Sequence, residues 1–185
     1  MKNALEKAGL DVEVTSKPSQ IESADAVILP GVGAFGPAAE NITPLKSTIL
    51  KTLESGTTIL GSCLGMQLFF DYSEESSGDG LGLLGGGVIR FKGDVKVPHM
   101  GWNTLKVVRK NELLEGIRGD DYFYFVHSYY ADPTDLQVTV ANTHYSLDFP
   151  SVVARDNVYG TQFHPEKSGK TGATLLKNFA RIVKK

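Results

Sequence analysis

The sequence predicts an α/β fold, a three-layer sandwich with a mostly parallel central sheet and a small antiparallel β insertion. Short, largely apolar segments such as Ala26–Leu29 and Thr57–Leu60 alternate with helical patterns in the first part of the chain. Such an alternation is typical of a parallel sheet that helices cover on both faces. After Tyr72, several strand-like segments follow one another through short turns such as Asp156-Asn157, which indicates added antiparallel strands.

In the N-terminal part, Lys2–Ala8 is predicted to be a helix that ends at Gly9, and Asp11–Thr15 a strand. Pro44–Ser55 has proline near its first turn and glycine just past its end, which favours a helix. The apolar run Leu64–Phe70 is predicted to be a further helix.

The C-terminal part begins with Ser73–Gly87, a segment rich in serine, glycine and acidic residues that we expect to be a mobile loop. Its Gly85-Gly86-Gly87 lacks the lysine and serine or threonine of a phosphate-binding loop. A final helix, Thr174–Lys184, is expected to cover the sheet, so that residues 1–185 form one domain. The strands predicted between these segments are Val88–Phe91, Thr104–Val108, Tyr122–Val126, Gln137–Asn142, Ser151–Arg155 and Val158–Gln162.

Composition excludes several classes of function. A formal net charge of −2 over 185 residues gives no basic surface for nucleic acid or anionic membranes. The single cysteine excludes an intramolecular disulfide and fits a reducing cytosol, and no membrane-spanning or signal segment is visible, so a cytoplasmic location is expected. Four dispersed histidines and one cysteine do not form a metal-site pattern, and no cofactor is expected.

Cys63 is the most informative residue because it lies in Gly61-Ser62-Cys63-Leu64-Gly65, between a predicted strand and a predicted helix. A nucleophile between two glycines at a strand–helix turn is the pattern of a nucleophile elbow. The beginning of a helix also favours a negative charge on the sulfur. This pattern predicts attack by a cysteine on a carbonyl, whereas the alternative is a small buried apolar residue with no chemical role.

A thiol nucleophile needs a base, and His164 in Gln162-Phe163-His164-Pro165-Glu166 follows an apolar strand, where α/β sheets place their sites. Pro165 favours extended backbone at His164, which would let Glu166 lie beside the imidazole and fix its tautomer. The alternative is a polar surface turn.

Pro30-Gly31-Val32-Gly33 follows the strand Ala26–Leu29. Its glycines permit unusual backbone angles, so the amide of Val32 and that of Leu64 could form an oxyanion hole. The alternative is a plain strand-to-helix turn.

Together, the Cys63 and His164 motifs resemble those of class I (triad) glutamine amidotransferases. Two further blocks, Pro98-His99-Met100-Gly101-Trp102-Asn103 and Tyr124–Tyr130, resemble in particular the glutaminase subunits of imidazole glycerol phosphate synthases in histidine biosynthesis. The resemblance runs from Met1 to the C-terminus.

The resemblance implies a role for each matching residue. Cys63 would attack the side-chain amide of glutamine, His164 would carry the proton to ammonia, and Glu166 would orient His164. Gln67 would contact the bound glutamine. The substrate would also be held by Gly31, Gly33 and the backbone of Ser128 and Tyr129.

The resemblance also implies a heterodimer with a (β/α)8-barrel cyclase subunit that receives ammonia through an internal channel. Met100, Trp102 and Asn103 would contact this partner, and Trp102 has the character of an interface anchor, although a half-buried core tryptophan is the alternative. His99 and His127 lie in the same blocks and could belong to the interface or to the glutamine pocket. His144 carries no signal.

The chain departs from the family at its start. Relatives usually begin with an apolar strand and a Gly-Asn turn, whereas here Met1 falls inside the helix that follows, so about twenty residues of the family pattern, including a strand of the sheet, are expected to be missing.

Three alternatives to this function stay open: a glutaminase subunit for anthranilate, aminodeoxychorismate or purine synthesis; a stand-alone cysteine hydrolase; and a catalytically inactive regulatory subunit.

Overall fold

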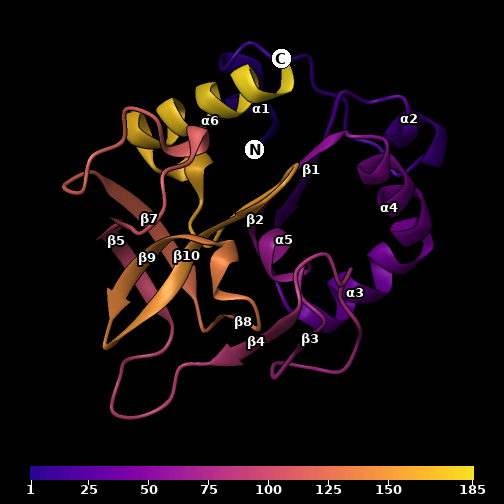
Figure 1. Cartoon of the computed structure of the whole chain (residues 1–185). Coiled ribbons are helices and arrows are strands. Elements are labelled where there is room, and N and C mark those ends of the chain that lie inside the picture. The colour runs from indigo at the N-terminus through magenta and orange to yellow at the C-terminus, as the bar shows by residue number, and fades with distance from the viewer.

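The computed structural model describes residues 1–185 and has three layers, a central sheet with helices on both faces (Figure 1). The helices are α1 (Lys2–Lys7), α2 (Pro18–Glu22), α3 (Phe35–Ile42), α4 (Lys46–Glu54), α5 (Leu64–Gln67) and α6 (Gly169–Val183). The strands are β1 (Ala26–Gly31), β2 (Thr58–Cys63), β3 (Tyr72–Ser73), β4 (Gly86–Arg90), β5 (His99–Thr104), β6 (Lys106–Val107), β7 (Tyr122–His127), β8 (Tyr129–Pro133), β9 (Thr139–Tyr145), β10 (Leu147–Arg155) and β11 (Val158–Thr161).

The central sheet has six strands in the order β1-β2-β11-β10-β9-β6. The strands β1, β2 and β11 pair in parallel, and the remaining pairings are antiparallel, so four of the six strands run in the same direction. The turn at Asp156-Asn157 joins β10 and β11 as an antiparallel hairpin, as the sequence predicted. Two smaller sheets, β3-β4-β8 and β5-β7, form the predicted β insertion.

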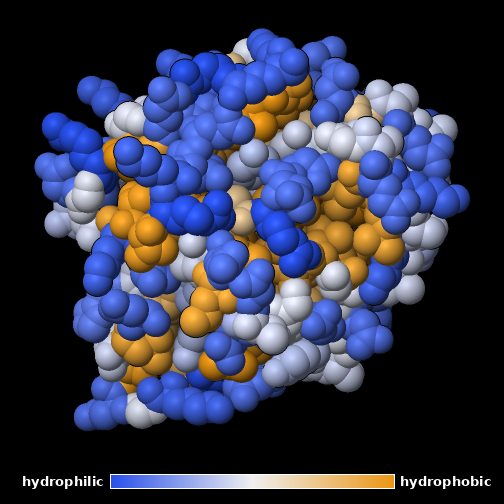
Figure 2. Space-filling model, in the orientation of Figure 1, coloured by the Kyte–Doolittle hydropathy of each residue, from blue (hydrophilic) through white to orange (hydrophobic).

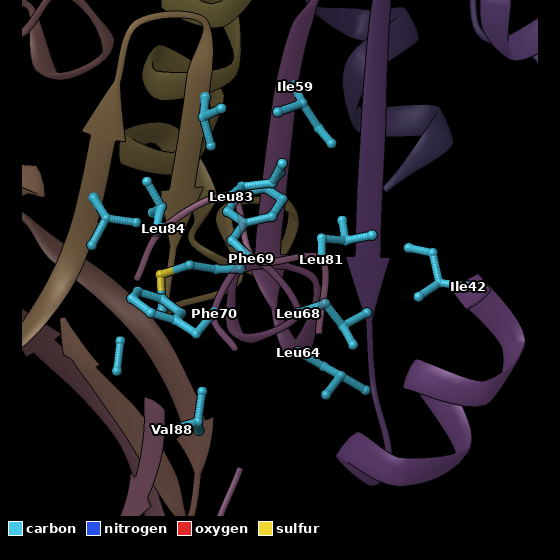
Figure 3. Packing of buried hydrophobic residues seen from close by; sticks show 14 of the residues in the cluster. Ile42, Ile59, Leu64, Leu68, Phe69, Phe70, Leu81, Leu83, Leu84 and Val88 are labelled. Carbon is cyan, nitrogen blue, oxygen red and sulfur yellow. The ribbon is translucent and has the colours of Figure 1, made fainter. Parts of the chain in front are cut away.

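The central strands are buried on both faces because their side chains alternate between two apolar cores. Along β2, Ile59 packs with α3 and α4, whereas Leu60 packs with α1 and α6. Along β11, Val158 and Tyr159 divide in the same way. The first core includes Phe35, Ala39 and Ile49. It also includes the residues labelled in Figure 3, among them Ile42, Leu64, Leu68, Phe69, Phe70, Leu81, Leu84 and Val88.

The strand β1 lies at one edge of the sheet and pairs only with β2. Its apolar residues Ala26–Leu29 are only partly buried, whereas the residues of β2 are all buried. Apolar surface is visible between β1 and α4, and again over β5 and β7 (Figure 2). An unpaired edge of this kind exposes backbone donors and acceptors.

Several sequence predictions of local structure are wrong. Asp11–Thr15 forms no strand: its valines alternate as in a strand, but no neighbouring edge pairs with it, and Val14 is exposed. The helices α2 and α3 were not predicted. The helix expected over Leu64–Phe70 ends at Gln67, although the following residues stay buried.

The segment Ser73–Gly87, which the sequence predicts to be a mobile loop, makes contacts with the rest of the protein. Leu81 and Leu84 are buried in the first core. The Asp71 carboxylate also accepts a hydrogen bond from the backbone N–H of Gly86, at 2.8 Å. These contacts hold the segment against the sheet.

Two further predicted strands have different boundaries in the β-rich part. The strand expected over Thr104–Val108 is divided between the end of β5 and the short β6. The one expected over Gln137–Asn142 begins with a 3-10 turn, Leu136–Val138, and continues as β9 to Tyr145.

No helix of the structure has the length and apolar character needed to cross a membrane.

Candidate active site

Cys63 ends β2 and directly precedes α5, with backbone angles φ 54° and ψ −112°. Residues other than glycine rarely adopt a positive φ. A nucleophile elbow uses this strained turn to expose its nucleophile. The flanking glycines are required by close packing rather than by a positive φ. A Cβ atom on Gly65 would lie 1.7 Å from the carbonyl oxygen of Leu29, and one on Gly61 would lie 2.6 Å from the amide nitrogen of Met66. The turn therefore packs closely against strand β1 at Gly65 and against helix α5 at Gly61.

His164 follows β11, which pairs in parallel with β2, so the carboxyl ends of the two strands bring His164 near Cys63. The Nδ1 atom of the ring lies 2.9 Å from Oε1 of Glu166. The backbone at His164 is extended as predicted, but Glu166 itself lies in a 3-10 turn, Pro165–Lys167, rather than in an extended segment. The predicted contact is present, and a tight turn produces it.

The surroundings of His164 favour its charged form. Burial alone would lower the pKa of the ring, but Cys63 and Glu166 outweigh it and raise the pKa to about 9. Burial would likewise raise the pKa of Glu166, but the hydrogen bond with His164 and the charge of its ring hold it below the usual value. The His164 Nε2 atom is buried and makes no hydrogen bond. No protein group therefore holds the proton of this nitrogen, which is free to take or give one.

Cys63 and His164, but not Glu166, line one cavity of about 370 Å³, a size typical of small-molecule sites. Its lining includes Cys63 and Gln67, which are four residues apart, and His164, about a hundred positions later in the sequence. The other predicted site residues that line it are Val32, Gly33, Leu64, Ser128 and Tyr129. The structure therefore brings together most of the residues that the motifs singled out.

Gln67 is oriented by two hydrogen bonds from its Nε2 atom, one to the carbonyl oxygen of Tyr129 at 3.0 Å and one to Oε1 of Gln162 at 3.2 Å. Both amide hydrogens are thereby used within the protein. Only its Oε1 acceptor is left for a ligand. A substrate contact of Gln67 must therefore come from an N–H group of the substrate.

Sequence reasoning missed Gln162, whose wholly buried amide donates from Nε2 to the Cys63 sulfur at 3.8 Å. The signal was available, because a polar residue ends an otherwise apolar strand directly before Phe163-His164.

It also missed Glu75, which lines the cavity. Its Oε2 atom accepts from the backbone N–H of Phe35 at 2.7 Å, and the neighbouring Ser76 accepts from that of Gly36 at 2.7 Å. The segment thus caps α3 and holds a carboxylate over the cavity. Its acidic and glycine-rich composition concealed this role.

The predicted oxyanion segment runs along the cavity. Gly31 lies so close to the elbow that a Cβ atom there would be 2.5 Å from Cβ of Leu64. Gly33 has φ 109°, which favours glycine, and the side chain of Val32 is 77% exposed. The segment is therefore anchored at Gly31 and open beyond it.

The predicted partner residues differ among themselves. Met100 and Trp102 lie on β5 with exposed fractions of 63% and 56%, so both side chains are available to a partner. Asn103 is half-buried, and its amide makes hydrogen bonds within the protein, with His99, His144 and Thr104. Its alternate position along the strand turns it toward the protein.

No group of three or more histidine, cysteine, aspartate or glutamate side chains is arranged to hold a metal ion. The exposed His144 pairs instead with Asp148, at 2.7 Å.

Comparisons with known proteins agree with these motifs. The family model described as glutamine amidotransferase class-I matches residues 1–183. The chain is 50% identical over 173 residues to imidazole glycerol phosphate synthase subunit HisH of Methanocaldococcus jannaschii, covering 93% of this chain and 88% of that protein. It is also 50% identical over 184 residues to HisH of Archaeoglobus fulgidus, covering 98% and 91%.

Solved structures share the fold at low sequence identity. A crystal structure of a glutamine amidotransferase matches with a TM-score of 0.77 at 21% identity, covering 100% of this chain and 92% of that one. The structure of PurLQS from Thermotoga maritima matches with a TM-score of 0.73 at 20% identity, covering 98% and 90%. The family match over nearly the whole chain and the high identity to these relatives lead to one conclusion: the chain belongs to the class I glutamine amidotransferase family.

Proposed function

We propose that this chain is the glutaminase subunit of an imidazole glycerol phosphate synthase, hydrolysing glutamine to glutamate and ammonia for a cyclase subunit. The observation that carries the proposal is the cavity where Cys63 meets the His164–Glu166 pair. The curated relatives with about half of their residues identical are subunits of that synthase, which supports this assignment over other amidotransferases.

In the first step, the Cys63 sulfur attacks the side-chain carbonyl carbon of glutamine and forms a carbon–sulfur bond. The charged His164 gives its Nε2 proton to the leaving nitrogen, so ammonia departs and a thioester remains. Water then attacks the thioester while His164 accepts its proton. Glutamate leaves and the thiolate is restored.

Glu166 keeps the imidazole oriented and stabilises its positive charge through the 2.9 Å contact. The backbone amides of Val32 and Leu64 are proposed to stabilise the oxyanion that forms on the carbonyl oxygen. Because the segment beyond Gly31 is open, ligand or partner binding can complete this oxyanion hole.

Glutamine recognition is assigned to groups that line the cavity. The Gln67 Oε1 atom, the only free hydrogen-bonding atom of that amide, accepts from a substrate N–H group. The backbone of Ser128 and Tyr129 borders the other side, but the Tyr129 carbonyl already accepts two hydrogen bonds within the protein. We therefore assign the substrate contacts there to backbone N–H groups. Gly33 is a further boundary of the cavity, and Gly31, which does not line it, is proposed to hold this segment against Leu64.

The partner is proposed to be a (β/α)8-barrel cyclase that forms a heterodimer with the surface around Met100 and Trp102. In the β5-β7 pairing, Met100 lies opposite Val126, which lines the cavity and whose carbonyl oxygen is 3.9 Å from the Cys63 sulfur. This surface is therefore next to the point where ammonia would be released. The lone free cysteine fits a cytoplasmic location.

Ammonia release from glutamine tests the proposal, measured with and without the cyclase of the same organism, for the wild type and Cys63→Ala. The wild-type complex should release ammonia and the variant should not, and a glutamine-derived chloroketone should label Cys63. Activity only on other amides would indicate a stand-alone cysteine hydrolase. Activity only with an anthranilate, aminodeoxychorismate or purine synthase partner would assign the chain to that synthase. Full turnover by Cys63→Ala would exclude the mechanism.

A further inference from the structure

Two buried histidines that the proposed mechanism does not use face each other beside the cavity. His99 on β5 lies opposite His127 on β7, and His99 Nδ1 is 2.9 Å from His127 Nε2. Both side chains are buried. They belong to a longer series of hydrogen bonds that runs from Asn103 to the carbonyl oxygen of Tyr129. The groups at its two ends determine which nitrogen of each imidazole carries the hydrogen.

The outer end of the series is Asn103. The backbone N–H of Thr104 donates to Asn103 Oδ1 at 2.8 Å, which fixes the orientation of the amide. Its Nδ2 group then donates to His99 Nε2 at 3.2 Å and to the carbonyl oxygen of His144 at 3.0 Å. His99 Nε2 must therefore be an acceptor without a hydrogen.

The inner end is the carbonyl oxygen of Tyr129, which lies 2.8 Å from His127 Nδ1. A carbonyl oxygen can only accept, so His127 carries its hydrogen on Nδ1. Its Nε2 atom then accepts from His99 Nδ1. Both ends thus require the same arrangement, in which each ring is neutral and protonated only on Nδ1.

A second proton on either ring would place two donors face to face. Burial of the pair away from water also disfavours a charge on either ring. Burial lowers the pKa of His99 to about 4. Burial is also the main cause that lowers the pKa of His127, to about 3, against the opposing effect of its bond to Tyr129. The rings packed closely around the pair are Phe91, Phe125, Tyr145 and Phe149.

The series continues from Tyr129 into the site. The same carbonyl oxygen accepts from Gln67 Nε2 at 3.0 Å, Gln67 also donates to Gln162, and Gln162 donates to the Cys63 sulfur at 3.8 Å. One backbone oxygen is therefore the joint between the histidine pair and the side chains around the nucleophile. Moving it would displace Gln67 first and Gln162 next.

We propose that His99 and His127 are positioning residues for the glutaminase reaction, a neutral pair that holds the Tyr129 carbonyl where it orients Gln67 and Gln162 beside Cys63. The expected effect on turnover rests on the proposed function. The arrangement of protons on the two rings does not, because it follows from the hydrogen bonds alone. The pair touches no reacting atom in the proposed mechanism. Asn103 sets its orientation from the outer end.

Two substitutions of His127 separate positioning from packing. His127→Asn places an amide N–H where Nδ1 was and keeps the donor to Tyr129, but it removes the ring. His127→Phe keeps a ring and removes the donor. Positioning predicts that His127→Phe lowers kcat/KM by about 10- to 100-fold, the scale expected for a small displacement of catalytic groups, and that His127→Asn recovers most of the loss. The exposed His144→Asn is the control and should match the wild type.

The opposite order, with His127→Phe more active than His127→Asn at equal thermal stability, would overturn the inference and leave only a packing role. A second measurement requires neither variant nor activity. Nitrogen-15 NMR of the wild-type ring nitrogens should show both histidines neutral and protonated on Nδ1 at pH 7. An Nε2-protonated tautomer or a charged ring would also overturn the inference, whereas an inactive wild type with the expected tautomers would refute the proposed function alone.

Discussion

His164 and His127 both line the cavity beside Cys63, yet their rings are in opposite states. Burial lowers the pKa of each ring, but Cys63 and Glu166 raise that of His164 to about 9, whereas that of His127 falls to about 3. The difference is the chemistry of the partner. The carboxylate beside Nδ1 of His164 stabilises a positive charge on the ring. The carbonyl oxygen beside Nδ1 of His127 and the His99 ring beside its Nε2 require only one hydrogen on the ring, so His127 stays neutral.

The comparison separates two uses of a buried imidazole. His164 keeps an Nε2 atom with no hydrogen-bond partner, which leaves a proton to be transferred. Both nitrogens of His99 and of His127 are occupied. A ring with a free nitrogen is suited to proton transfer, and a ring with none is suited to holding its neighbours in place.

The largest effect is expected from removing the mobile proton. His164→Asn should lower kcat for glutamine hydrolysis about 10³- to 10⁴-fold, since it removes both the general acid and the general base. Initial rates of ammonia release measure this, with His144→Asn as the matched surface control. Comparable rates for the two variants would show that His164 is not the proton carrier.

Removing the carboxylate partner should have the next largest effect. Glu166→Gln should lower kcat about 100-fold or more, because the ring loses its orientation and the stabilisation of its charge. The pKa of His164 should fall from about 9 toward its ordinary value, so the alkaline limb of the pH–rate profile should move to lower pH. An unchanged limb would mean that Glu166 does not set the state of His164.

The two states also predict opposite pH dependences of the free energy of unfolding. His99 and His127 have a folded-state pKa below the unfolded value of about 6.5, so the unfolded chain binds more protons and stability falls as the pH drops below that value. Each contributes a slope of at most about 1.4 kcal/mol per pH unit. His164 has a raised pKa, so its contribution is complete below about 6.5 and is lost as the pH rises toward 9.

Urea unfolding of the wild type and His99→Phe between pH 7 and pH 5 measures the acid side of this contrast. The phenylalanine ring keeps the packing with Phe125 and Tyr145 but cannot bind a proton, so the variant should lose less stability over this interval. Carboxylates contribute equally to both proteins and cancel in the difference. An identical loss would mean that His99 is charged in the folded protein.

The smallest effect on either pair is expected from Trp102→Ala. Its side chain is exposed beside Tyr124 and makes no hydrogen bond with the His164–Glu166 pair or the His99–His127 pair. The thermal stability and the protonation of the histidine rings should therefore stay within error of the wild type. Binding to the proposed cyclase should weaken by about 2 kcal/mol, the cost of losing an interface hot spot. Calorimetric titration with the cyclase measures it, and unchanged affinity would remove Trp102 from the interface.

The sequence was sufficient for the charged pair but not for the neutral one. Cys63, His164 and Glu166 lie in short local patterns, at a glycine-flanked turn and around a proline, and these patterns were enough to predict the contact between His164 and Glu166, although a 3-10 turn rather than an extended segment produces it. The His99–His127 contact depends on the register of β5 against β7, which no local pattern encodes.

The fold followed the same rule. Buried strands such as β2 and the β10–β11 hairpin were predicted because apolar runs and a short turn identify them. Asp11–Thr15 failed because alternating valines make a strand only where an edge is available to pair. Glu75 was missed because its place over the cavity depends on the amino end of α3, forty positions earlier in the chain.

Nitrogen-15 NMR of His164, His99 and His127 in one sample at pH 7.5 tests the contrast most directly. We predict that His164 is protonated on both nitrogens while the other two rings are each protonated once. A neutral His164 in the folded protein, or three rings that titrate together near pH 6.5, would contradict it.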